Sequence, residues 1–271
     1  MKRVKAALLG DPVSHSLSPR LFERIGRRLK TAVAYDAIRV GPGDLDCAVA
    51  FLRRGKYAGF NVTIPLKESI ISQLDALTPE ARAIGAVNAV KLGRRAVGHN
   101  TDAAGFRDAL LETGFSPAKR PALVFGAGGA ARAVGYALGL CGASRVRFCA
   151  RSAPRARQTA RDLGKAFPKT RFSAGQAVSA PLWVNATPLG MKGFPQRSPA
   201  PKGLGGCELA FDLVYGRKTP FLKQARASGS ETVDGLSMLA YQALRAWEFW
   251  FKPLPAPRRR ALKTAIIRGL P

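Results

Sequence analysis

The sequence predicts an α/β protein built from two domains. Strand-like and helix-like segments alternate along nearly the whole chain, and a glycine-rich turn joins a strand to a helix near its middle. At roughly 150 residues per domain, 271 residues fit one large domain or two ordinary ones. Apolar residues make up 46% of the chain, which is enough for packed cores and excludes a disordered basic tail.

The first domain is expected to span residues 1–102 and to be completed by C-terminal helices within 236–271. Its predicted elements are strands at Val4–Leu9, Ala32–Ile38 and Gly59–Thr63, a strand pair from Gly85 to Gly98, and helices at Ser18–Leu29, Leu45–Leu52, Pro65–Leu74, Leu236–Phe251 and Arg258–Arg268. Prolines open two of these helices, and Ser18 is expected to cap the first one.

Residues 103–235 are expected to form the second domain. Its predicted elements are helices at Ala103–Thr113, Ala130–Leu140 and Arg155–Ala166 and strands at Ala122–Phe125, Arg145–Cys149, Leu182–Asn185 and Leu209–Leu213. This alternation predicts mainly parallel sheets with helices on both faces, and a cleft between the two domains.

The charge balance raises the question of a nucleic-acid partner. The chain carries 44 Lys and Arg against 17 Asp and Glu, a formal net charge of +27. The most basic segments, Arg145–Arg171 and Arg245–Pro271, do not interleave aromatic residues as a base-stacking platform would, and the sequence has no helix-turn-helix or zinc pattern. We therefore expect weak, salt-sensitive binding of polyanions and no specific nucleic-acid partner.

The cysteines indicate a reducing compartment. Neither CxxC pairs nor metal-ligand spacing with His15 and His99 is found around the four cysteines, Cys47, Cys141, Cys149 and Cys207. We expect reduced thiols, no metal site and a cytoplasmic protein without a signal peptide or membrane contact. The apolar segment Pro121–Ser144 contains six glycines, which argues against a membrane span.

A phosphate-binding loop is predicted where the strand Ala122–Phe125 meets the following helix. The segment Gly126–Ala131 fits the pattern G-x-G-x-x-A in the strand–turn–helix context that binds a dinucleotide. Gly126 would allow the tight turn, Gly128 the close approach of the backbone to a pyrophosphate and Ala131 close helix–sheet packing, with backbone amides at the helix start facing the pyrophosphate.

The residues after the next strand favour NADP over NAD. A NAD site has an acidic residue there, whereas this chain has Arg151, Ser152 and Arg155 and no acid between Cys141 and Arg161. Two guanidinium groups and a hydroxyl suit a 2′-phosphate. The alternative is a solvated basic helix start.

Two ionisable residues are candidates for proton transfer. Lys67 falls in the first turn of the helix expected at Pro65, where the helix dipole disfavours its charged form; the alternative is a surface lysine paired with Glu68. Asp102 either caps the helix at Ala103 or orients the ammonium of Lys67. Ser16 and Ser18 are two residues apart, so in an extended segment both hydroxyls would point the same way and could grip a carboxylate or a hydroxyl.

Together these motifs resemble the shikimate dehydrogenase family. The resemblance covers about Leu9 to Gln242 and rests on nine segments in register: His15–Pro19, Asn61–Glu68, Gly85–Asn88, Asn100–Asp102, Gly126–Arg132, Asn185–Met191, Phe211–Tyr215, Thr219–Phe221 and Gly235–Leu239.

The resemblance implies reversible NADPH-dependent reduction of 3-dehydroshikimate to shikimate, a step of the pathway to chorismate and the aromatic amino acids. It implies that Lys67 and Asp102 form the catalytic dyad. It assigns the substrate to Ser16, Ser18, Asn61, Thr63, Lys67, Asn88, Asp102, Tyr215 and Gln242. It implies a Rossmann-type NADP-binding domain in which Gly126, Ala127, Gly128, Gly129 and Ala130 wrap the pyrophosphate. It adds Thr187, Met191, Leu213, Gly235 and Met238 near the nicotinamide.

Two departures from the family pattern concern the cofactor and the charge. Ala150 stands where the family often has Asn beside the adenosine, and the overall basicity is unusual for the family. A quinate/shikimate or aminoshikimate-type dehydrogenase of the same family is the alternative function, and a basic polyanion-binding or NADP-sensing protein is the alternative of another class. We expect a monomer or a homodimer.

Overall fold

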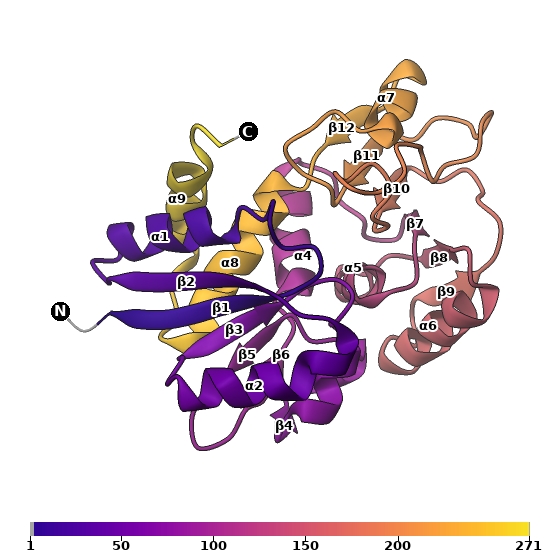
Figure 1. Cartoon of the computed structure of the whole chain (residues 1–271). Coiled ribbons are helices and arrows are strands. Elements are labelled where there is room, and N and C mark those ends of the chain that lie inside the picture. Colours follow the sequence, from indigo (N-terminus) through magenta and orange to yellow (C-terminus); the bar gives the residue numbers. More distant parts are fainter. Residues whose placement is uncertain (1–2, 271) are drawn as a thin grey trace. The chain divides into compact units, whose positions relative to one another are not determined.

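The computed structural model describes residues 3–270, which form two compact units, each with its own sheet (Figure 1). The first unit comprises residues 3–101 and 240–268, and the second comprises residues 102–239 with residues 269 and 270.

The first unit is built on a mixed sheet. Its elements are β1 (Val4–Gly10), α1 (Ser18–Arg28), β2 (Val33–Arg39), η1 (Pro42–Asp44), α2 (Leu45–Arg54), β3 (Gly59–Val62), η2 (Ser69–Gln73), β4 (Ala76–Leu77), α3 (Pro79–Ile84), β5 (Ala89–Lys91), β6 (Val97–His99), most of α8 (Leu236–Trp250) and α9 (Ala256–Ile267). The strand order is β2-β1-β3-β5-β6-β4. β1 pairs in parallel with β2 and β3, whereas β5 is antiparallel to both of its neighbours.

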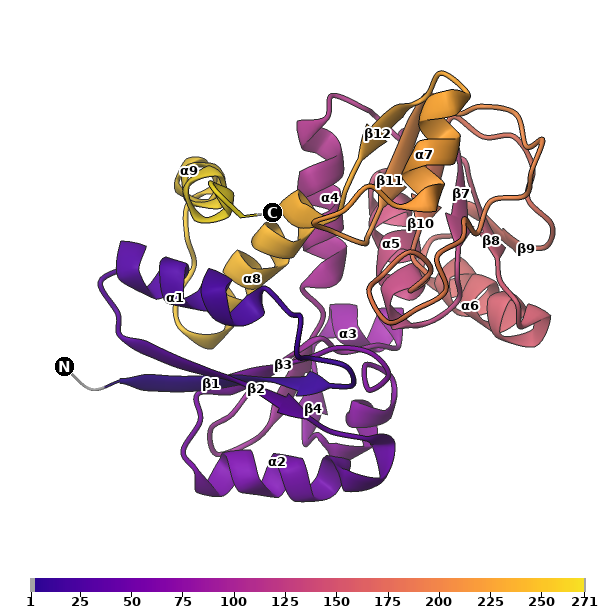
Figure 2. The same cartoon turned by 45° about the horizontal axis from the view of Figure 1, so that its top comes forward.

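Helices cover both faces of this sheet. On one face Leu45, Val49 and Leu52 of α2 join the core formed with the strand residues Leu9 and Phe60. On the other face lie α1 and α8 (Figure 2). There Phe22 of α1 stacks on Tyr35 of β2 with ring centroids 4.4 Å apart.

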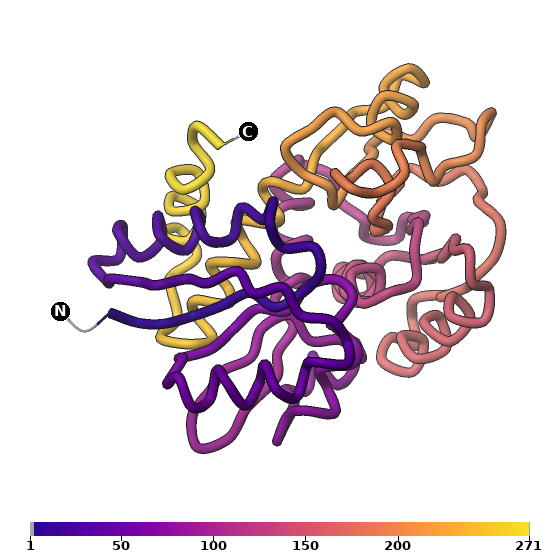
Figure 3. Tube along the Cα trace, in the orientation of Figure 1, coloured from indigo at the N-terminus to yellow at the C-terminus, as the bar shows by residue number. Residues whose placement is uncertain are grey.

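The C-terminal segment returns to the first unit, where α9 lies beside α1 (Figure 3). Trp250 of α8 stacks on Phe22 at 5.2 Å and donates its Nε1 hydrogen to the Val90 carbonyl at 3.0 Å. A Cβ at Gly59 would lie 2.5 Å from Trp250 Nε1, so only glycine lets the indole approach the sheet this closely.

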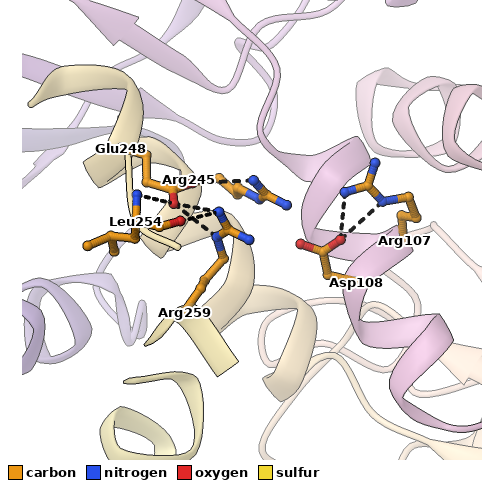
Figure 4. Close-up of polar contacts among 6 residues, drawn as sticks. All are labelled: Arg107, Asp108, Arg245, Glu248, Leu254 and Arg259. Atoms are coloured by element: carbon orange, nitrogen blue, oxygen red, sulfur yellow. Dashed lines mark hydrogen bonds and ion pairs between the residues drawn. The ribbon is translucent and has the colours of Figure 1, made fainter. Parts of the chain in front are cut away.

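A carboxylate on α8 holds the proline-rich corner that leads into α9 (Figure 4). Glu248 accepts from the Leu254 amide at 2.9 Å and from Arg259 at 2.7 and 3.0 Å. Arg259 also donates to the Leu254 carbonyl. The Arg259 and Glu248 side chains are only 12% and 10% exposed, so the ion pair is largely desolvated.

The second unit has a six-stranded parallel sheet. Its elements are α4 (Asp102–Glu112), β7 (Pro121–Phe125), α5 (Gly129–Leu140), β8 (Arg145–Cys149), α6 (Ala153–Ala166), β9 (Arg171–Ala174), β10 (Leu182–Asn185), β11 (Leu209–Asp212), α7 (Pro220–Ala227) and β12 (Glu231–Val233). The strand order β12-β11-β10-β7-β8-β9 is that of a Rossmann fold. From β7 the chain adds β8 and β9 on one side, and then returns to add β10, β11 and β12 on the other side, so the strand order reverses between β7 and β10.

Aromatic contacts show that helices cover both faces of the second sheet. On one face a Cβ at Gly135 of α5 would lie 2.6 Å from the ring of Phe148, and Phe106 of α4 meets Phe211 at 5.0 Å. On the other face Phe221 of α7 packs against Phe125 at 5.8 Å. The predicted α/β architecture is therefore confirmed for each unit, although the first sheet is mixed.

One predicted helix is wrong. Residues 65–74 form a turn followed by the short 3₁₀ helix η2, not an α-helix that begins at Pro65. The Lys67 carbonyl accepts from the Val87 amide at 2.8 Å, and the Ile71 amide bonds to Glu68. The hydrogen bond that would continue an α-helix through Lys67 is replaced by a tertiary one, so the helix-dipole argument for Lys67 fails.

Other differences concern short or irregular elements. Ser18 does not cap α1: it is the first helical residue, and Leu17 occupies the cap position. The sequence also missed β4, α3, β9, α7 and β12, which have two to eight residues each. Among residues 3–270, no helix is long and apolar enough to cross a bilayer.

Replacing Glu248 with Ala should lower the free energy of unfolding by about 3 kcal/mol, because it strands the Arg259 guanidinium in a desolvated corner. The matched control is Glu23→Ala, which removes an exposed i,i+4 pair with Arg27 and should cost less than about 0.5 kcal/mol. Urea titrations of both variants measure the difference. Equal losses in the two variants would contradict this role for Glu248.

Candidate active site

In the first unit, the predicted substrate residues come together around Asn88. Its carboxamide oxygen accepts from the Thr101 amide at 2.6 Å, and its nitrogen lies 2.9 Å from the Thr101 hydroxyl and 3.3 Å from Gln242 Oε1. The backbone carbonyl of Asn88 accepts from Asn61 Nδ2 at 3.0 Å. Three amide side chains from β3, the start of β5 and α8 therefore form one buried network.

Ser16 and Ser18 lie in the turn that leads from β1 into α1. Ser16 Oγ accepts from the Ser18 amide at 3.2 Å, and the two hydroxyls are 3.1 Å apart. The expected extended conformation is therefore wrong, yet the turn into the helix brings both hydroxyls together. Two adjacent hydroxyls suit a carboxylate oxygen.

Lys67 and Asp102 belong to different units. Lys67 is half-buried in the turn before η2, and Asp102 is buried at the first position of α4. Within the first unit, the Lys67 carbonyl accepts from the Val87 amide, and the Thr101 amide donates to Asn88 Oδ1. Thr63, half-buried, donates its amide to Leu9 at the end of β1.

In the second unit, the predicted phosphate loop has the geometry of a dinucleotide cradle. Gly126 has φ +115°, which favours glycine, and a Cβ there would lie 3.1 Å from the Ala186 carbonyl oxygen. Gly128 occupies the N-cap position of the twelve-residue helix α5, and no side chain caps that helix. Amides at the helix start can therefore face a phosphate.

The three residues predicted for the 2′-phosphate lie at the exposed start of α6. Arg151, Ser152 and Arg155 are all exposed, and Ser152 caps the helix by accepting from the Arg155 amide. Cations and a helix N-terminus at the end of β8 make a setting that fits a phosphate dianion.

A buried carboxylate that the sequence analysis did not single out holds the loops after β10 and β11. Asp212 accepts from Asn185 at 2.9 Å, from the Val214 amide at 3.0 Å and from the Thr219 hydroxyl at 2.5 Å. Asn185 in turn accepts from the Thr187 hydroxyl at 2.6 Å. Burial raises the pKa of Asp212 to about 6, although these donors lower it in part.

Of the residues expected near the nicotinamide, Thr187, Met191 and Leu213 lie on these same loops, whereas Gly235 follows β12 and Met238 lies in α8. Gly235 donates its amide to the Val214 carbonyl at 3.1 Å, and a Cβ at Gly235 would collide with the backbone of Leu213. Met191 follows the loop from Thr187, Tyr215 follows Val214 and is half-buried, and Met238 is buried in α8.

A second missed group links the phosphate loop to α6. Thr159 donates to the Ala127 carbonyl at 3.3 Å, and Arg132 bonds to Thr159 and to Asp162 at 3.3 and 2.7 Å. The sequence feature that could have predicted this group is the presence of polar residues at positions expected to be buried next to the glycine loop. Among the described residues, no cluster of three or more His, Cys, Asp or Glu could hold a metal ion.

Comparisons with known proteins identify the family. Residues 8–90 match the model of the shikimate dehydrogenase substrate binding domain. Shikimate dehydrogenase (NADP(+)) of Symbiobacterium thermophilum is 39% identical over 97% of this chain and 95% of that protein. The chain belongs to the shikimate dehydrogenase family. The resemblance inferred from the sequence motifs is thereby confirmed.

Relatives from distant organisms support the same assignment. The family member from Aeropyrum pernix, also named shikimate dehydrogenase (NADP(+)), is 41% identical over 91% of each chain. The crystal structure of shikimate 5-dehydrogenase from Thermus thermophilus, in complex with NADP(H) and shikimate, is 38% identical with a TM-score of 0.86. It covers 98% of this chain and 100% of its own, so the predicted fold class is confirmed.

The raised pKa of Asp212 predicts a pH-dependent stability. A carboxyl that ionises near pH 3.8 when unfolded and near pH 6 when folded contributes stability at low pH that is lost as the pH rises through about 4 to 6. Asp212→Asn stays neutral, and the Thr219 hydroxyl can turn to accept from the new amide.

The free energy of unfolding of the parent protein relative to Asp212→Asn should therefore fall by about 2 kcal/mol between pH 4 and pH 7. Urea titrations at constant ionic strength measure it. A difference that does not change with pH would contradict the assignment.

Proposed function

We propose that this chain catalyses the reversible NADPH-dependent reduction of 3-dehydroshikimate to shikimate. The observation that carries the proposal is the buried amide network of Asn61, Asn88 and Gln242, next to a serine pair. A site that recognises a small acid with several ring hydroxyls needs many directional hydrogen-bond donors and acceptors, which these amides and hydroxyls supply. The names of the relatives across nearly the full chain support the same reaction.

Different substrate residues bind different groups of the ligand. Ser16, Ser18 and Tyr215 hold its carboxylate, while Asn61, Thr63, Asn88 and Gln242 bond the ring hydroxyls. A site that pairs each hydroxyl with a buried polar group rejects a ligand lacking one, because that group is then left unsatisfied.

Lys67 and Asp102 move the proton. NADPH, when bound, supplies a hydride to the ketone carbon. The Lys67 ammonium donates a proton to the ketone oxygen, which becomes the hydroxyl, and Asp102 orients that ammonium and bonds the same substrate hydroxyl. In the reverse direction Lys67 accepts the proton.

The glycine loop Gly126–Ala130 fits the pyrophosphate of NADP, and Arg151, Ser152 and Arg155 fit its 2′-phosphate. Thr187, Met191, Leu213, Gly235 and Met238 line the nicotinamide position. The enzyme works in the cytoplasm with reduced cysteines, as a monomer or a homodimer.

Replacing Lys67 with Ala should lower kcat by at least about a hundredfold, because general acid–base catalysis contributes about 10² to 10⁴. The Kd for NADP, measured by fluorescence quenching or calorimetry, should change less than about twofold. The matched control is Lys56→Ala, an exposed lysine in the loop after α2, which should keep the parent kcat. Parent-like turnover in Lys67→Ala would reject the dyad.

A further inference from the structure

We propose that Tyr35 is a positioning residue for substrate binding, acting through Asn61. This inference rests on the proposed function, because Asn61 is assigned there to a ring hydroxyl of the substrate. No motif singled out Tyr35, which lies in the middle of β2 and is half-buried.

The tyrosine hydroxyl stands between the two parts of the predicted substrate site. It donates to Asn61 Oδ1 at 2.9 Å. The Ser18 side chain lies near enough to act on the phenol as a hydrogen-bond donor, which lowers the pKa of Tyr35 in part. A phenol has a single hydrogen, so once it donates to Asn61 it can only accept from Ser18.

This arrangement fixes which way the Asn61 amide points. Its oxygen faces the Tyr35 hydrogen, and its nitrogen donates to the Asn88 carbonyl at 3.0 Å. A flipped amide would set its oxygen against that carbonyl oxygen, and two acceptors repel each other. Asn61 therefore offers a ligand an N–H donor, which suits the oxygen of a hydroxyl group.

Two further observations make Tyr35 a fixed donor. Its ring stacks on Phe22 at 4.4 Å, and Phe22 is held in turn by Trp250, so the phenol cannot swing away from Asn61. Burial raises the pKa of Tyr35 well above its usual value, so the phenol keeps its hydrogen at any working pH.

Tyr35→Phe tests this role, because it removes the hydroxyl and keeps the stacked ring. With shikimate and NADP, we expect the KM for shikimate to rise about tenfold, the effect of one lost hydrogen bond to a buried amide. The kcat and the KM for NADP should change less than about twofold. The matched control is Tyr57→Phe, whose hydroxyl donates at 2.6 Å to Asp36, the residue after Tyr35; it should keep the parent constants.

A double-mutant cycle separates positioning through Asn61 from a general loss of packing. If Tyr35 acts through Asn61, adding Tyr35→Phe to Asn61→Ala should raise the KM for shikimate less than about threefold. A tenfold further increase in that background would overturn the inference, as would an unchanged KM in the single variant. If Tyr35→Phe lowers kcat and raises the KM for shikimate and the KM for NADP by similar factors, and also lowers the Tm, the role of Tyr35 is purely structural and the inference is overturned.

The parent enzyme separates this inference from the proposed function. If the parent chain turns over shikimate and the Tyr35→Phe variant has the same KM for shikimate as the parent, only the positioning role is rejected. A parent chain that neither binds nor oxidises shikimate rejects the proposed function and the inference with it.

Discussion

The first unit's site depends on satisfying the buried carboxamide of Asn88. A buried amide left without partners costs about 1 to 3 kcal/mol for each unmet group. Asn88 finds its partners in Thr101, just before α4, and in Gln242 on α8, while its carbonyl holds Asn61 at the end of β3. These segments are far apart in the sequence, so the network forms only when the C-terminal helix has returned to the N-terminal sheet. The aromatic stack of Trp250 on Phe22 secures that return.

The second unit follows the same physical rule at the ends of its parallel strands. Asn185 and Asp212 face each other in register at the carboxyl ends of β10 and β11. Their hydrogen bonds to Thr187, Val214 and Thr219 fix the loops that carry Met191, Leu213 and Tyr215. The glycine loop occupies the neighbouring strand end, where the sheet order reverses. Each unit thus supports its binding loops on polar residues buried at strand ends.

Buried parallel strands could be predicted from the sequence with accurate bounds. The strands Arg145–Cys149 and Leu182–Asn185 match the structure residue for residue, because buried parallel strands are short apolar runs between turns. The helix at Pro65 failed because a tertiary bond from Val87 takes the Lys67 carbonyl, which no local pattern reveals. The strands β4 and β12 have too few residues for any periodicity.

The candidate site shows the same division. Motifs with fixed spacing gave the serine pair, the glycine loop and the arginines that we propose for the 2′-phosphate. Residues that act by holding others, such as Tyr35, Asp212 and Thr159, have no spacing of their own and became visible only through their hydrogen bonds. The pairing of Lys67 with Asp102 is a prediction from the family resemblance, since 34 intervening residues carry no geometric constraint.

The net charge of +27 suits a small-molecule enzyme with anionic ligands, since a positive field raises the capture rate of anions at low salt. The most direct test of the proposed reaction is kcat/KM for shikimate and for quinate, each with NADP and with NAD. The highest value is expected with shikimate and NADP, and at least about tenfold less with NAD, because the guanidinium contacts to the 2′-phosphate are lost. Turnover of quinate alone, equal values with both cofactors, or no turnover at all would contradict the assignment.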